Sequence, residues 1–316
     1  MTLCVAASAL LASPLHAAEA ASPFGDDLDA ARAKAQAEHR DVLVDFTGSD
    51  WCGWCVKLDK EVFHQPEFKA EAGKSFELVQ LDFPHDKSKQ TPEITARRKA
   101  WKTELKSSSF PDILLLDEKG KVFGQMNYRE GGVKPFLASL EAQRQGRIRR
   151  DAALAAAEKS QGIARAQHLD EALTALNDED VLLRYYGDVI SEILKLDASG
   201  EAGLKAKYQG VLARKKAESE IDRLCGEKDG AVMLAKMKEY ASRSGLPAET
   251  RQYALYMAAA VACERMLKDA PQGLALIDEA MAIAPDSELA KERLADAKVR
   301  LERRVAKKAA AGSASK

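Results

Sequence analysis

Two cysteines separated by two residues, Cys52 and Cys55, lie in the run WCGWC of this 316-residue chain. They follow an apolar segment, residues 41–46 (DVLVDF). If a helix begins at Cys52, the free N–H groups and the dipole at its N-terminus favour a thiolate over a thiol. Cys55 then lies roughly one turn further in and is shielded. Such a pair suits thiol–disulfide exchange, in which one sulfur attacks a disulfide and the other resolves the mixed disulfide.

Two other interpretations of the cysteine pair are a static disulfide and one half of a metal site. A structural zinc site needs four ligands. The sequence has no second CxxC or CxxH motif, and His64 and His85 are isolated. We therefore predict a redox pair, with no metal and no organic cofactor. Cys52 is the expected nucleophile, with a pKa below the free value of roughly 8.5, and Cys55 is the expected resolving thiol.

The elements that must position this pair follow from hydrophobic patterning. Residues 42–46 are short, apolar and partly β-branched, which indicates a buried central strand, and a helix is expected from residue 52 to 63. Asp26 or Asp27 is the expected cap of a first helix, and Pro66 the residue that ends or kinks the active-site helix. The other expected elements are a first helix at 26–40, a strand at 76–83, a helix at 92–105, strands at 112–116 and 121–126, and a helix at 133–145.

The run LVDF at 43–46, followed by WCGWC, resembles the active-site segment of thioredoxin-fold proteins. The longer string FTGSDWCGWCVKL at 46–58 is most similar to exported bacterial thioredoxin-like proteins. The resemblance implies an α/β thioredoxin fold for residues 21–146, with parallel strands first and an antiparallel hairpin last. It also implies a thiol–disulfide oxidoreductase that acts on protein cysteines through its CxxC pair. The sequence leaves the direction of electron flow open.

Asp45 resembles the buried acidic residue that lies beneath the second cysteine in this family. Burial without a partner raises the pKa of a carboxyl group, so Asp45 would accept the proton of Cys55. The segment between Asp45 and Cys52 is one residue longer than in thioredoxin itself. The loop between them must therefore accommodate an additional residue. The alternative is a carboxylate bonded to backbone at the end of the strand.

The resemblance also assigns a substrate groove. Pro111 matches the cis-proline of the family, and Phe110 would line the same groove; the alternative is an ordinary trans proline in a loop. Trp51 matches the aromatic residue before the first cysteine. Trp54 replaces the Pro or His of better-known members and adds no positive charge, so we expect a less oxidising site than one with His. Lys57, like His64 and His85, is expected to be a surface residue.

Residues 1–20 are interpreted as a secretory signal. The segment 3–15 is apolar and small, the AEA at 18–20 is a plausible cleavage site, and the run is too short for a mature transmembrane helix. No Lys or Arg precedes the apolar core, and a disordered apolar N-terminus is the alternative. A signal would place the mature protein in the periplasm or outside the cell, where disulfides persist.

Residues 147–308 are predicted to form an all-α helical domain, because strand patterns almost disappear after a composition shift near 144–150. Tetratricopeptide-like hairpins and a plain helical bundle both fit this pattern, and residues 273–294 look like one such hairpin. Cys225 and Cys263 lie on separate expected helices, either as buried thiols or joined by a structural disulfide. Residues 309–316 are expected to form a flexible tail.

The charge balance argues against polyanionic partners. There are 48 Lys and Arg residues against 49 Asp and Glu residues, so the formal net charge is −1. The sequence therefore has no excess of positive charge that would indicate binding to nucleic acid or to an anionic membrane. The expected partners are protein thiols or disulfides and an unknown redox partner. The competing hypothesis is an interaction scaffold, in which the helical domain binds partners and the thioredoxin fold is a docking module.

Overall fold

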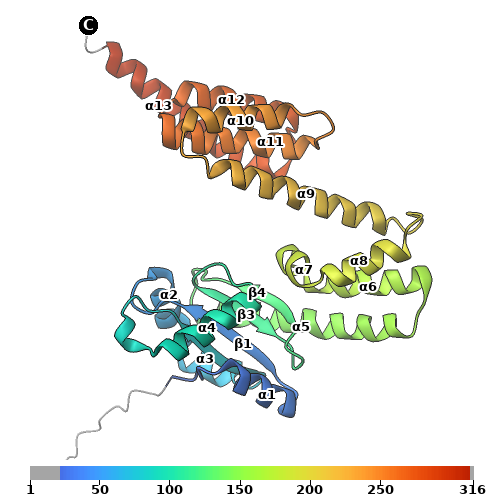
Figure 1. The fold of residues 1–316 in the computed structure, drawn as a ribbon. Helices are drawn as coiled ribbons and strands as arrows, with labels where there is room; N and C mark the ends of the chain where they lie inside the picture. Colours follow the sequence, from blue (N-terminus) through green and yellow to red (C-terminus); the bar gives the residue numbers. More distant parts are fainter. Residues whose placement is uncertain (1–21, 314–316) are drawn as a thin grey trace, which may run out of the picture. The chain divides into compact units, whose positions relative to one another are not determined.

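The computed structural model describes residues 22–313. The predicted signal at 1–20 and the last three residues of the expected tail lie outside this range. The chain divides into two compact units, one ending at Ala198 and the other beginning at Ser199. Figure 1 shows the helices and strands of each unit.

The first unit is built on a four-stranded sheet with the order β2-β1-β3-β4. β1 pairs in parallel with β2 and antiparallel with β3, and β3 pairs antiparallel with β4. The predicted fold, with parallel strands first and the hairpin last, is therefore confirmed. The strands are β1 (Asp41–Thr47), β2 (Phe76–Asp82), β3 (Asp112–Leu116) and β4 (Val122–Met126).

Helical segments connect most of the strands of the first unit, and further helices follow β4. Asp27 caps the first of them, because its side chain accepts hydrogen bonds from the N–H groups of Asp29 and Ala30. The active-site helix is α-helical first and then continues as a π-helical turn, η1. The helices are α1 (Leu28–Glu38), α2 (Gly53–Leu58), η1 (Asp59–Phe63), α3 (Pro66–Ala72), η2 (Lys87–Lys89), α4 (Pro92–Glu104), α5 (Val133–Glu158), α6 (Gly162–Leu176), α7 (Glu179–Tyr185) and α8 (Gly187–Leu196).

β1 is buried along its whole length, which places it at the centre of the core. Val42, Val44 and Phe46 lie on one face and share a cluster with Leu28 of α1 and Trp101 of α4. Because side chains alternate along a strand, residues 43, 45 and 47 face the other way. The sheet therefore holds the side chain of residue 45 on the face opposite to α1 and α4.

α5 differs from the expected helix at 133–145, because it continues without a break to Glu158. The chain therefore has no helix end at residue 145, where the sequence pattern predicts one. Gly146 lies inside α5 and lets this helix pack closely against α6. A Cβ at this position would lie 2.7 Å from the carbonyl oxygen of Ala175 on α6. A domain boundary at 146 thus falls inside one helix. Whether residues 21–146 fold independently stays a prediction.

The segment after residue 146 packs on the sheet through a buried polar cluster. Arg150 of α5 lies 2.6 Å from a carboxylate oxygen of Asp117 and donates a 2.7 Å hydrogen bond to the hydroxyl of Tyr186. That hydroxyl donates in turn to the carbonyl of Val122 on β4, at 2.9 Å. Burial raises the pKa of Tyr186 to about 12, so it stays a neutral donor. Helices α5 to α8 are therefore joined to the β3–β4 hairpin in one unit.

The second unit is all-α over its described residues, which confirms the predicted helical C-terminal part. Gln252 is fully buried, and its amide donates to the carbonyls of Ala280 and Ala284. A tetratricopeptide repeat stays a prediction. The helices are α9 (Leu204–Cys225), α10 (Gly230–Ser242), α11 (Ala248–Met257), η3 (Ala258–Leu267), α12 (Ala270–Ile283), η4 (Ala290–Leu294) and α13 (Ala295–Ser313).

The two cysteines of this unit, Cys225 and Cys263, are both free thiols in the structure, so the disulfide considered for them is not formed. Cys263 is buried in the helical core, and burial raises its pKa to about 11. It therefore serves as a small apolar core residue. α13 continues to Ser313, through most of the expected tail.

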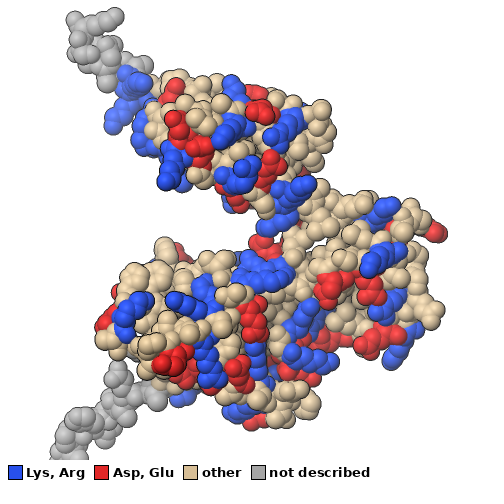
Figure 2. Space-filling model, viewed as in Figure 1, with Lys and Arg blue, Asp and Glu red and all other residues tan. Residues whose placement is uncertain are grey.

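Charges of both signs are interspersed on the visible face of each unit (Figure 2). This distribution agrees with the near-zero net charge of the whole sequence. Within residues 22–313, none of the helices combines the length and the apolar character that a membrane crossing requires.

Candidate active site

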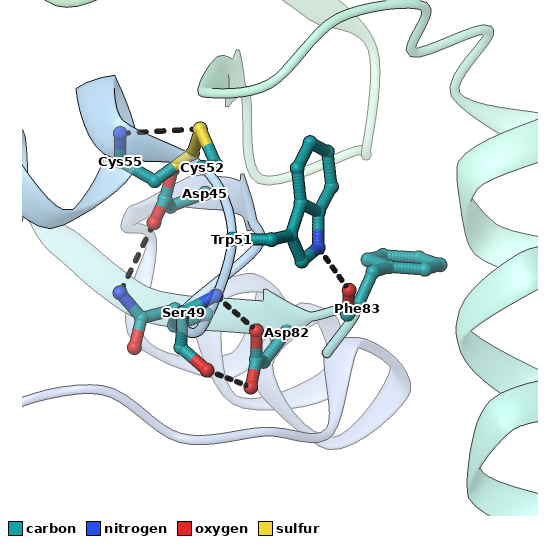
Figure 3. Close-up of a disulfide and its surroundings, with 8 residues drawn as sticks. Asp45, Ser49, Trp51, Cys52, Cys55, Asp82 and Phe83 are labelled. Atoms are coloured by element: carbon teal, nitrogen blue, oxygen red, sulfur yellow. Dashed lines mark hydrogen bonds between the residues drawn. A yellow bond between two sulfur atoms is a disulfide. The ribbon is translucent and has the colours of Figure 1, made fainter. Parts of the chain in front are cut away.

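Cys52 is the N-cap residue of α2, as the sequence predicts. It forms a disulfide with Cys55, with a Cα–Cα distance of 5.2 Å. The backbone N–H of Cys55 donates to the sulfur of Cys52 at 3.2 Å (Figure 3). Cys52 is 6% exposed and Cys55 2% exposed. In the reduced state the same N–H and the helix N-terminus would stabilise a thiolate on Cys52, the more exposed of the two cysteines.

The loop between β1 and α2 is fixed by contacts with the end of β2. Ser49 donates to both carboxylate oxygens of Asp82, through its backbone N–H at 2.9 Å and its hydroxyl at 2.7 Å (Figure 3). Gly48 lets the indole of Trp51 approach, because a Cβ there would lie 2.4 Å from a ring carbon. The loop thus accommodates the one additional residue between Asp45 and Cys52, and Cys52 remains at the start of α2.

Trp51 is held on three sides beside the disulfide. Its indole N–H donates to the carbonyl of Phe83 at 2.8 Å. The ring stacks on His85, with centroids 4.9 Å apart, and meets the ring of Phe110 edge-on at 5.3 Å. His85, expected to be an isolated surface residue, therefore supports the predicted groove aromatic.

Asp45 lies beneath the disulfide (Figure 3) and is fully buried. One carboxylate oxygen accepts a 3.1 Å hydrogen bond from the side-chain amide of Gln80, and the other has no hydrogen-bond partner. The pKa of Asp45 is raised to about 7, chiefly by burial; the Gln80 hydrogen bond opposes the rise, and the nearby charge of Asp59 contributes to it. A carboxyl group with this pKa can exchange a proton at neutral pH.

The peptide bond between Phe110 and Pro111 is cis, as the resemblance implies. Both residues line a groove of about 430 Å³ together with Trp54 and Tyr128. Trp54 is 58% exposed and stacks on Tyr128 with ring centroids 5.3 Å apart. The predicted groove residues Phe110, Pro111 and Trp54 are thus brought together, and Trp51 reaches them through Phe110.

Sequence reasoning missed several residues of this site. Tyr128 also lines the groove, and Lys57 lies 5.5 Å from the Trp54 ring centroid and 5.1 Å from that of Tyr128. Gln80 could have been found, because it is a polar residue between the buried Val79 and Leu81 of β2 and lies opposite Asp45 in the register with β1. Asp59 carries no sequence signal that separates it from other helix carboxylates.

Metal ligation finds no support among the described residues. No group of three or more His, Cys, Asp or Glu side chains in residues 22–313 is arranged to hold a metal ion.

Residues 24–118 match the family model described as thioredoxin-like. With the sheet order and the CxxC pair at the start of α2, this match shows that the N-terminal part of the chain carries a thioredoxin-like domain.

Among curated proteins, the chain is similar to the disulfide bond reductase DsbH of Chlamydia pneumoniae, with 31% identity over 105 residues. It is also 32% identical over 93 residues to the thioredoxin-related protein DsbJ of the same organism. The matches cover 33% and 29% of this chain, and 63% and 26% of the relatives. The chain therefore spans less than two thirds of each of these relatives.

Solved structures with similarity include a DsbH oxidoreductase, with 26% identity, a TM-score of 0.37 and coverage of 44% of this chain and 94% of that one. The C-terminal domain of Neisseria meningitidis DsbD in the oxidised form is 24% identical, with a TM-score of 0.30 and coverage of 38% and 99%.

Proposed function

We propose that this protein is a thiol–disulfide oxidoreductase that acts on protein cysteines through Cys52 and Cys55. The observation that carries the proposal is the Cys52–Cys55 disulfide at the start of α2 with the buried carboxyl of Asp45 beneath it. The similarity to a protein named as a disulfide bond reductase supports the reducing direction.

In that direction, the thiolate of Cys52 attacks a substrate disulfide. A bond forms between Cys52 and one substrate sulfur, and the other substrate sulfur leaves as a thiolate that takes a proton from water. Cys55 then gives its proton to Asp45 and attacks the sulfur of Cys52. The Cys52–Cys55 disulfide forms and the second substrate thiolate leaves. The substrate gains two electrons, and a thiol donor must reduce the enzyme again.

The groove beside the disulfide is the proposed place for an extended substrate segment. Phe110, Pro111, Trp54 and Tyr128 line this groove. Their rings offer apolar surface, so side chains next to the substrate cysteine would bind by burial of apolar area. We further propose export to the periplasm or beyond, supported by the apolar segment at 3–15, and a partner-positioning role for the helical part.

The test compares the purified protein with Cys52→Ser and Cys55→Ser variants. Wild type should accelerate the reduction of insulin disulfides by dithiothreitol, and Cys52→Ser should lose this acceleration entirely. Cys55→Ser should accumulate a mixed disulfide with the substrate, because the resolving thiol is missing. Equal rates for wild type and Cys52→Ser would reject catalysis and favour the scaffold hypothesis. Oxidative refolding of a reduced protein in the same series would show whether the oxidising direction dominates.

A further inference from the structure

Five exposed basic side chains gather on one surface of the second unit, which η3 and α13 form together. Arg265 and Lys268 belong to the end of η3, and Arg300, Arg303 and Arg304 belong to α13. These five residues are called the basic surface. Figure 2 shows Lys and Arg side chains gathered at the end of the second unit where Figure 1 draws α13. The near-zero net charge of the whole chain therefore hides a local excess of positive charge.

A buried carboxylate, Glu264, holds two of these guanidinium groups in place. It is 9% exposed, and Arg300 donates hydrogen bonds to both of its oxygens, at 3.0 and 3.2 Å. Arg304 lies 3.1 Å from one of the same oxygens. The hydrogen bonds from Arg300 hold the pKa of Glu264 below its ordinary value, so this carboxylate stays charged. Each guanidinium has five N–H donors, more than these contacts use, so both are oriented and can still bind a second carboxylate.

The other three cations of the basic surface are not neutralised within the chain. Arg265, Lys268 and Arg303 have no hydrogen-bond or ion-pair partner among residues 22–313. Two acidic residues, Glu264 and Asp296, lie beside the five basic ones. An excess of positive charge therefore remains at this surface and would attract a ligand that carries several negative charges.

The basic surface is hollowed rather than flat. Two hollows of about 440 and 630 Å³ share Arg300 and Arg304 as lining residues. Tyr256 lines the first hollow, and Val299, which is 47% exposed, lines the second. An extended acidic segment could place carboxylates against the guanidinium groups and pack other side chains on Tyr256 and Val299.

A membrane fits this surface less well than a protein segment does. A helix that binds a bilayer surface inserts its apolar face between the lipids. The apolar face of α13 is not available for this, because Ala297 and Leu301 are buried in the helical core of the second unit. The positive charge on α13 is thus presented without the apolar face that membrane binding requires.

We propose that the basic surface binds an acidic segment of a partner protein, whose Asp and Glu side chains pair with the five basic residues. The proposal rests on the partner-positioning role proposed for the helical part, and it names the chemistry of the partner. The thiol–disulfide exchange at Cys52 does not depend on it.

The experiment measures binding of fluorescein-labelled octaglutamate to the oxidised full-length protein by fluorescence anisotropy. The wild type should bind this peptide at about 50 mM salt, more weakly at about 300 mM salt, and should not bind labelled octaglutamine. Replacing Arg265, Lys268 and Arg303 together by Gln should weaken binding roughly tenfold, because three exposed ion pairs are lost. Arg265→Lys combined with Arg303→Lys keeps the charge and should bind within about twofold of wild type.

The matched control replaces Lys216, Arg223 and Lys228 by Gln. These residues are also exposed and lie in the second unit, but they line neither hollow. The control loses the same charge and should bind octaglutamate like wild type. Equal weakening in both triple variants would show charge attraction without a defined surface and would overturn the proposal.

Two further results would overturn the proposal. One is a wild type that does not bind octaglutamate at about 50 mM salt. The other is a wild type that binds phosphatidylserine vesicles but not the peptide, which would assign the surface to membranes. Insulin reduction by the triple variant at residues 265, 268 and 303 should equal that of wild type. The failure of the proposed function would appear in the insulin assay alone, so the two failures are distinguishable.

Discussion

At the scale of single residues, Asp45, the proposed proton acceptor, carries a cost in stability. Its pKa is about 7 in the folded protein against an ordinary value of 3.8. Between these two values the folded chain binds more protons than the unfolded chain. The free energy of unfolding therefore falls as the pH rises through this window. The stabilising contribution of the protonated group is complete below about pH 3.8 and is lost above about pH 7.

We predict that Asp45→Asn is more stable than wild type at pH 8, because the amide never ionises and still accepts a hydrogen bond from Gln80. At about 1.4 kcal/mol per pKa unit the difference should be a few kcal/mol. It should shrink toward zero near pH 4. Urea unfolding of the two oxidised proteins at pH 4, 6 and 8 measures it. Asp41, whose pKa is raised to about 6 by burial, adds the same pH slope to both proteins. A difference that does not vary with pH would contradict the raised pKa.

At the scale of elements, α5 shows how one glycine lets two helices approach. Gly146 lies inside α5 and opposite the backbone of α6, where any Cβ would meet the Ala175 carbonyl at 2.7 Å. A glycine in a helix usually costs stability relative to alanine. Here the close contact between the helices outweighs that cost, because backbone cannot move aside as a flexible side chain can.

We therefore predict that Gly146→Ala destabilises the first unit by about 1–3 kcal/mol, although alanine is the better helix former. Gly210, inside α9, is the matched control, because a Cβ there would meet nothing within 4 Å. Gly210→Ala should stabilise the second unit by about 0.5–1 kcal/mol. Differential scanning calorimetry of the full chain measures both changes. A Gly146→Ala protein as stable as wild type would show that α5 and α6 separate easily.

At the scale of the molecule, the first unit extends beyond the thioredoxin-like domain to Ala198. Arg150 is buried against Asp117 and Tyr186, and these contacts join the later helices to the hairpin. Removing one side of a buried charge pair leaves the other unpaired, at a cost of roughly 3–5 kcal/mol. The helices after residue 146 are thus part of the structure that carries the active site.

We predict that a fragment of residues 22–198 unfolds in one cooperative transition, with a midpoint close to that of the first unit in the full chain. A fragment of residues 22–146 should lose several kcal/mol, because α5 is cut and Asp117 loses Arg150. Urea unfolding followed by circular dichroism, with both fragments oxidised, compares them. Equal stability of the two fragments would instead support an independent thioredoxin-like domain that ends at residue 146.

The sequence by itself determined the features that depend on neighbours along the chain. The spacing of Cys52 and Cys55, the apolar run of β1 and a helix cap at Asp26 or Asp27 are local patterns, and each leads to its element. The resemblance added the roles of Asp45 and Pro111, and the structure shows the first buried and the second preceded by a cis bond. The order of elements along the chain, with the parallel strands before the antiparallel hairpin, followed from the same two sources.

Only the tertiary structure decided what meets across the fold. Gln80 reaches Asp45 because β2 pairs with β1 in one register, and Tyr128 reaches Trp54 because the segment after β4 passes beside α2. The continuity of α5 likewise depends on what packs against Gly146. The physical reason is common to all three cases. Periodicity and capping act over a few residues, whereas these contacts join side chains dozens of positions apart, whose meeting depends on the packing of the whole core.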